Sequence, residues 1–148
     1  MANPFGMPDQ AYDVLRLAIA YALALPVGWY REKEAHSVGV RTFPLVAMAS
    51  CGYVLLTTSM DAAAPSRVIQ GLVAGIGFIG GGAILKSEGN VHGTATAASI
   101  WTTGVLGAAV AQDRYFVAAT LALVNLFTLR VLLPWKQKMD AGEAKKET

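Results

Sequence analysis

The sequence predicts an all-α polytopic membrane protein, a compact bundle of five transmembrane helices. Hydrophobic residues make up 54% of the 148 residues and charged residues only 15%, whereas soluble domains carry about 25% charged residues. The mean hydropathy is +0.44, and most charges fall in short clusters between long uncharged runs. The single cysteine, Cys51, excludes a disulfide scaffold. The net charge of +2 argues against a nucleic-acid-binding protein.

Five apolar runs, separated by short loops that contain charged residues, predict the five helices. A helix that crosses the hydrocarbon core needs about 20 apolar residues, with a working range of about 17–25. Because the loops are short, the helices should pack as neighbours in one bundle. The predicted spans are residues 12–30, 43–58, 68–85, 93–111 and 115–133.

The distribution of lysine and arginine predicts which side of the membrane each loop faces. Cytoplasmic loops carry an excess of these residues. If the loop after the first span is cytoplasmic, eight of the loop and tail lysines and arginines lie inside and two lie outside. The N-terminal segment 1–11 is then extracytoplasmic and the tail 134–148 is cytoplasmic. Only an odd number of spans places the basic first loop and the basic tail on the same side.

Glycine is concentrated in the third predicted span. At 100° per residue, these glycines fall on two faces, and both faces contain a small-xxx-small pattern that lets helix backbones approach closely. This pattern favours a central helix packed between neighbours. The alternative is a helix broken at residues 80–82, which would mark a binding site as in transporters. The predicted helix-packing glycines are Gly71, Gly75, Gly77, Gly81 and Gly82, together with Gly93 at the start of the fourth span.

Polar side chains form a stripe along one side of the fourth predicted span, where helical geometry aligns His92, Thr96, Ser99 and Thr103. The hydroxyl groups could bond to their own helix four residues back. They could instead bond to the third span, through Gln70, or line a polar cavity. The candidate ligand- or partner-binding residues in this region are therefore Thr96, Ser99, Gln70 and His92.

Charged residues inside the spans are few. Asp13 and Arg16 lie three residues apart near the outer end of the first span, a spacing that allows an ion pair on a helix. We expect this pair to be structural.

Charges gather on the predicted cytoplasmic face. Arg31, Glu32 and Arg41 lie in or beside the first loop, and residues 86–92 form the second cytoplasmic turn. Because both loops are short, they should meet on the face of the bundle. They form either a polar docking or ligand site, or only the charge that sets topology.

The motifs of common enzymes are missing. The sequence contains no HExxH, P-loop, GxSxG or CxxC motif. Residues 75–80 match G-x-G-x-x-G, but no strand precedes them, so we interpret them as helix packing. We expect a non-enzymatic protein with no cofactor and no metal site, and we do not expect nucleic acid as a partner.

Several stretches together resemble the MgtC/SapB family of bacterial inner-membrane proteins. They are Gly28-x-x-Arg31-Glu32, Gly39-x-Arg41-Thr42-x-x-Leu45-Val46-Ala47, Pro65-Ser66-Arg67-Val68, Gly75-Ile76-Gly77-Phe78-Ile79-Gly80-Gly81-Gly82 and Asn90-Val91-x-Gly93-x-x-Thr96-Ala97-Ala98-x-x-Trp101. Their order and spacing match the family's membrane domain over residues 12–133. In this sequence a short tail follows this region, so we expect no counterpart of the soluble C-terminal domain that some members carry.

The resemblance implies a five-span inner-membrane domain associated with magnesium-limited growth and, in pathogens, with survival inside host cells. It also implies regulatory contact with other membrane proteins. The family pattern adds Arg67 to the candidate binding residues. Tyr30, His92 and Ala95 depart from that pattern, where family members commonly have an acidic residue, an arginine and a polar residue.

Two functions remain. One is a regulator in the bacterial inner membrane that contacts a partner membrane protein, with a homo-oligomer left open. The other is a transporter or channel for Mg²⁺ or another small solute. Mg²⁺ prefers oxygen ligands that include carboxylates, and Asp13 is the one acidic residue inside a predicted span. We therefore favour the regulator.

Overall fold

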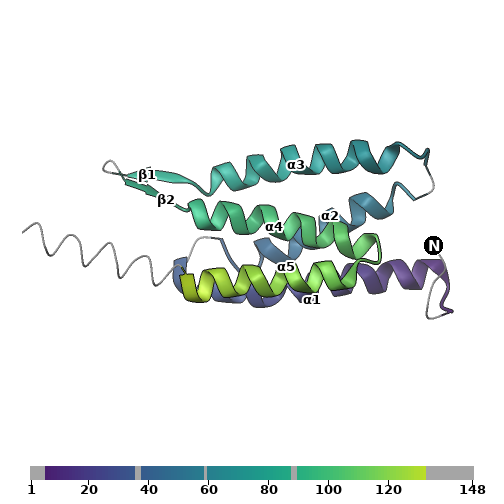
Figure 1. Ribbon diagram of the computed structural model, residues 1–148, viewed down its shortest axis with the longest axis horizontal. Coiled ribbons are helices and arrows are strands. Elements are labelled where there is room, and N and C mark those ends of the chain that lie inside the picture. The colour runs from purple at the N-terminus through teal and green to yellow at the C-terminus, as the bar shows by residue number, and fades with distance from the viewer. Residues whose placement is uncertain (1–5, 36–37, 59, 88–89, 133–148) are drawn as a thin grey trace, which may run out of the picture.

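The computed structural model describes residues 6–35, 38–58, 60–87 and 90–132. Within these ranges the chain forms five α-helices, one short hairpin and a terminal π-helical turn (Figure 1). The five predicted helices are confirmed, and the hairpin was not predicted. The elements are α1 (Asp9–Ala35), α2 (Thr42–Leu55), α3 (Ala64–Gly82), β1 (Leu85–Ser87), β2 (Asn90–His92), α4 (Thr94–Ala111), α5 (Tyr115–Phe127) and η1 (Thr128–Leu132).

The helices run alternately up and down, as short loops require. One end of the bundle holds the start of α1, the α2–α3 connection and the α4–α5 turn, and the other end holds the end of α1, the hairpin and η1 (Figure 1). Three stretches are long and apolar enough to cross a membrane, and α2 is a shorter apolar helix of 14 residues. The chain is thus a multi-pass membrane protein by its apolar helices. The three stretches are Asp9–Lys33, Thr94–Ala111 and Tyr115–Leu132.

Helix α4 is the centre of the bundle, because it contacts all four other helices. Its small residues make this possible. A Cβ atom added at Gly107 would collide with the backbone carbonyl of Ala47 in α2, and one added at Gly104 would collide with the side chain of Ile76 in α3. The largest fully buried apolar side chains around α4 include Phe43, Ile100 and Leu106.

Helix α3 lies at the edge of the bundle, so the prediction of a central third helix is wrong. It packs chiefly on α4, where a Cβ atom at Gly80 would lie 3.3 Å from the carbonyl oxygen of Ala97. A Cβ atom at any of five other glycines would meet nothing within 4 Å, so these glycines do not pack against the described part of the chain. They are Gly71, Gly75, Gly77, Gly81 and Gly82.

The predicted alternative places a break in the third span at residues 80–82, and the helix ends within this segment, at Gly82, before the predicted end of the span. Helix α3 continues without interruption to Gly82, and its last carbonyl groups accept bonds from the amides of Ala83 and Ile84. The chain then enters the β1–β2 hairpin, where Leu85 pairs with His92. Gly93 adopts φ +88° between the hairpin and α4, a conformation that favours glycine. Its role is therefore in the backbone turn rather than in helix packing.

Candidate functional site

The predicted site residues Arg31 and Thr96 meet inside the bundle. Arg31, on α1, has 6% of its surface exposed, and its Nη2 donates a hydrogen bond of 2.5 Å to Oγ1 of the buried Thr96 on α4. A charged side chain inside a membrane bundle is costly and needs such partners. This contact therefore fixes α1 against the first turn of α4.

Glu32 closes the connection between α1 and α2. Its Oε2 accepts a hydrogen bond of 3.1 Å from the backbone amide of Val40. Glycine is required on both sides of this contact, because a Cβ atom at Gly39 would collide with Glu32 and one at Gly28 would lie 3.1 Å from the carbonyl oxygen of Gly39. The carboxylate therefore holds the loop against α1.

The other predicted residues of the cytoplasmic face do not take part in this contact through their side chains. The side chain of Arg41 is exposed at the start of α2, and that of His92 is exposed on β2. The hairpin projects beyond the ends of α3 and α4 (Figure 1). Among the described residues, no hydrogen bond or ion pair joins Arg41 or His92 to Arg31 or Glu32.

The hydroxyl stripe of α4 faces α1 and α5. Ser99 Oγ donates to Asn125 Oδ1 at 2.6 Å, and Asn125 Nδ2 donates back to the Ser99 carbonyl at 3.2 Å. Thr103 bonds to the carbonyl four residues back, as one of the two predicted alternatives states. Gln70 is exposed on the outer side of α3. The predicted contact between the stripe and the third span is therefore wrong.

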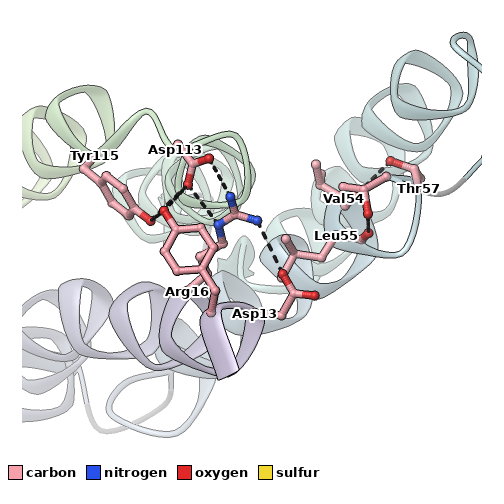
Figure 2. Close-up of polar contacts among 9 residues, drawn as sticks. Asp13, Arg16, Val54, Leu55, Thr57, Asp113 and Tyr115 are labelled. Carbon is pink, nitrogen blue, oxygen red and sulfur yellow. Dashed lines mark hydrogen bonds and ion pairs between the residues drawn. The ribbon is translucent and has the colours of Figure 1, made fainter. Parts of the chain in front are cut away.

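A second polar cluster, at the opposite end of the bundle, joins α1 to the α4–α5 turn (Figure 2). Arg16 Nε donates to Asp113 Oδ1 at 2.9 Å, and Arg16 Nη2 donates to Asp113 Oδ2 at 2.5 Å. The hydroxyl of Tyr12 donates to Asp113 Oδ1 at 2.7 Å, and that of Tyr115 donates to the same atom at 3.1 Å. The predicted pair of Arg16 and Asp13 is present at 3.4 Å, but Asp113 is the principal partner.

Asp113 is held as a carboxylate by this cluster. Burial raises its pKa, but the hydrogen bonds from Tyr12, Arg16 and Tyr115 and the charge of Arg16 together leave the pKa below its ordinary value. The residue also adopts φ +59°, a left-handed conformation that aspartate tolerates better than most residues. The turn geometry and the ion pair thus depend on each other.

An apolar groove of about 810 Å³ runs between α2 and α3. Arg41 and Thr42 lie at one end, and Arg67 lies at the other. Arg67 Nη2 is paired with Asp61 Oδ2 at 2.6 Å. Between the two ends, the α2–α3 groove is lined by apolar and small side chains, which include Leu45, Val46, Ala49, Gly71, Gly75 and Ile79.

Asn125 and Asp113 were missed by the sequence analysis. Asn125 is the one amide side chain within the last apolar run, and intramembrane polar residues usually face the bundle interior. That rule could have found Asn125. Asp113 could not have been assigned, because its partner lies 97 residues away and a local acid, Asp13, has the correct spacing for Arg16.

Buried polar groups thus join α1 to α4, α4 to α5, and α1 to the α4–α5 turn. The open surfaces include the α2–α3 groove and the outer stripe of α3, which consists of Gln70, Gly77 and Gly81 and meets nothing within 4 Å at its two glycines. Among the described residues, no three His, Cys, Asp or Glu side chains gather in a way that could hold a metal ion.

Comparison with known proteins gives clear relatives. The chain is 37% identical to Protein SrpB of Synechococcus elongatus in an alignment of 129 residues that covers 77% of this chain and 71% of SrpB. It is 34% identical to Protein MgtC of Salmonella typhimurium over 115 residues, 75% of this chain and 49% of that protein. It is 30% identical to the Escherichia coli protein described as "Putative magnesium transporter YhiD" over 127 residues, 80% of this chain and 59% of that protein.

The chain thus spans only about half the length of MgtC and somewhat more of YhiD. No solved structure matches it. Residues 17–138 match the MgtC family, and this region contains all five helices except the first turns of α1. The chain belongs to the MgtC family.

Proposed function

We propose that this protein is a non-enzymatic regulator in the bacterial inner membrane, linked to magnesium homeostasis or stress adaptation, that acts by contacting a partner membrane protein. The observation that carries the proposal is the outer stripe of α3. Gln70 is exposed there, and Gly77 and Gly81 have open space where a side chain would lie. Gln70 can donate and accept hydrogen bonds across a helix interface.

The glycines of this stripe argue for a protein partner. A glycine inside a helix costs about 1 kcal/mol relative to alanine, and packing within the described chain does not offset that cost at Gly77 or Gly81. Close approach of a helix from another protein would offset it, because small residues spaced by three allow backbone contact in a membrane.

The magnesium link rests on the relatives. MgtC of Salmonella typhimurium and YhiD of Escherichia coli share about one third of their residues with this chain over the membrane region. The second candidate function, a transporter or channel for Mg²⁺ or another small solute, is favoured by the description of YhiD. The α2–α3 groove is the feature that such a path would use.

Crosslinking tests the regulator. A photoreactive side chain at Ala74, which is exposed between Gln70 and Gly77, should capture a distinct membrane protein in native membranes. The Gly77→Leu substitution should weaken this capture, because the added side chain separates the two helices. Ala18→Leu, a small-to-large change on the exposed side of α1, is the matched control and should leave capture unchanged.

Flux measurements separate the two functions. The purified protein in vesicles should move no Mg²⁺ above the level of empty vesicles, because a regulator acts through its differential contact with a partner. Saturable Mg²⁺ uptake by the protein alone would overturn the proposal in favour of the transporter.

The crosslinking experiment has its own contradicting outcome. If a photoreactive side chain at Ala18 captured the same proteins as one at Ala74, the contact would not be specific to the outer stripe of α3.

A further inference from the structure

The α2–α3 groove is distinct from the outer stripe of α3, and its chemistry differs. We propose that the groove binds one anionic phospholipid, with its phosphate at Arg41 and an acyl chain along the wall formed by Gly71 and Gly75. This site lies on another face of the molecule from the surface used in the proposed function and does not depend on it.

The charges at the two ends of the groove indicate where the head group lies. Arg67 is neutralised by Asp61 at 2.6 Å. Arg41 is exposed and lines the groove, and within the described part of the chain it has no carboxylate partner. An anion therefore finds an uncompensated positive charge only at the Arg41 end of this groove.

The backbone of α2 does not supply the anion site. The amides of Thr42 and Phe43 both donate to the carbonyl of Gly39, at 3.0 and 3.2 Å, and Pro44 has no amide hydrogen. The usual anion-binding amides of a helix start are thus occupied or missing. The phosphate must be bound by the Arg41 guanidinium, which suits phosphate geometry, with Thr42 on the same wall.

The length of α2 brings Arg41 to the depth of a lipid head group. Its 14 residues extend about 21 Å at 1.5 Å per residue, whereas the hydrocarbon core is about 30 Å thick. A helix this short draws the polar boundary of the bilayer inward. The neighbouring α3 has 19 residues, so the wall that α3 contributes to the groove is longer than the wall that α2 contributes.

The walls of the groove suit an acyl chain. At Gly71 and Gly75 nothing lies within 4 Å of an added Cβ atom, so α3 presents bare backbone there. Leu45 and Val46 of α2 line the opposite side. The cation of Arg41 lies at one end and the Arg67–Asp61 ion pair at the other, with an uncharged lining between them. This arrangement complements a single anionic head group on an apolar chain. Basic pockets between helices on the cytoplasmic side, where Arg41 is predicted to lie, bind anionic lipid head groups.

Native mass spectrometry of the purified full chain tests the site. Dioleoylphosphatidylglycerol should be retained about fivefold more than dioleoylphosphatidylcholine, which has the same acyl chains, since one arginine near the surface supplies an interaction of that size. Arg41→Gln should abolish the preference. Lys86→Gln removes an exposed cation of the hairpin that does not line the groove, and it should keep the preference.

Two further substitutions on α3 test the acyl wall. Gly75→Leu should fold, because nothing lies within 4 Å of the added Cβ atom, but it should fill the groove and lower retention of both lipids. Gly77→Leu, on the outer stripe, should retain both lipids as the unmodified protein does. This pair separates the lipid site from the partner surface.

Three kinds of result would overturn the proposal. One concerns the lipid preference: the two lipids are retained equally, or the preference is unchanged in Arg41→Gln. Another is Arg41-dependent binding of glycerol 3-phosphate as tight as that of the phospholipid, which would indicate a site for a free phosphate compound. The third is a photoreactive group at Leu45 that forms adducts with a second copy or another protein and none with lipid, which would assign the groove to a helix.

Discussion

Arg16 holds both carboxylate oxygens of Asp113, a residue 97 positions later in the chain, and so ties the N-terminal half of α1 to the turn between α4 and α5. Both side chains are largely buried, with 10% and 21% of their surfaces exposed. Removal of one partner of a buried pair leaves an uncompensated charge. Loss of either side chain should therefore destabilise the bundle.

Asp113→Asn should lower the free energy of unfolding by about 3 kcal/mol, because the Arg16 guanidinium stays buried without its counter-charge. Unfolding of the purified protein in detergent measures this. Asp13→Asn is the matched control. Asp13 has 47% of its side chain exposed and lies 3.4 Å from Arg16, so its loss should cost less than about 1 kcal/mol. Equal losses in the two variants would contradict the assignment of Asp113 as principal partner.

Acid should weaken the same contact. The pKa of Asp113 is lower in the folded protein than its ordinary value, so its contribution to stability is complete above the unfolded pKa of about 3.9. That contribution is lost as the pH falls through the folded pKa. At pH values below about 4, the Tm of the protein in detergent should decrease. The Asp113→Asn variant should lack the part of this decrease that is due to Asp113. A pH profile identical in both proteins would exclude Asp113 as the titrating group.

The contact between Arg31 and Thr96 predicts a difference between two substitutions at Thr96. Thr96→Val removes the hydroxyl that accepts the Arg31 hydrogen bond and should cost about 1–3 kcal/mol, because a buried donor loses an acceptor. Thr96→Ser keeps the hydroxyl and should cost less. Unfolding in detergent compares them, and a greater loss in Thr96→Ser would indicate that the methyl group matters more than the hydrogen bond.

Glycine substitutions should have opposite effects in α4 and α3. Gly107→Ala places a Cβ atom against the Ala47 carbonyl and should lower the free energy of unfolding by about 1–3 kcal/mol. Gly75→Ala enters open space and should raise that free energy by about 0.5–1 kcal/mol through helix propensity. Thermal unfolding of the two variants gives the signs. Destabilisation by Gly75→Ala would show that α3 is packed after all.

Cysteine labelling tests the orientation. A membrane-impermeant thiol reagent added to intact cells should label Asp61→Cys, in the α2–α3 connection, and should not label Lys86→Cys, in the hairpin. The native Cys51 is buried and should not react in the unmodified protein. Labelling of Lys86→Cys from outside would reverse the orientation predicted from lysine and arginine.

The helices of this fold could be predicted because long apolar runs and basic loops are local properties of the sequence. The π-helical turn of η1 and the β1–β2 hairpin have no such signal, and the hairpin begins inside the predicted third span at Leu85. The meeting of Arg31 with Thr96 was not predicted as a pair, although both residues were candidates. The charge cluster of the first loop indicated Arg31 and the polar stripe of the fourth span indicated Thr96, and the packing of α1 on α4 brings them together.

The glycines show the limit of a sequence pattern. Gly71, Gly75, Gly77 and Gly81 have the spacing that favours close helix contact, but the pattern cannot state whether the contact lies within the chain or outside it. The close contacts within the bundle occur instead at Gly104 and Gly107, which the sequence analysis did not select. Tertiary placement of a whole helix decides between the two outcomes, and residue spacing does not carry that information.

The central place of α4 also constrains how the protein is made. During synthesis α1, α2 and α3 enter the membrane before α4 is complete. Helices α1 and α2 have an extensive contact of their own and can associate early, but α3 packs chiefly on α4. Until α4 is inserted, the third helix has only its smaller contact with α2. Insertion of α4 therefore completes the packing of α3, and α5 then adds to α4 and α1.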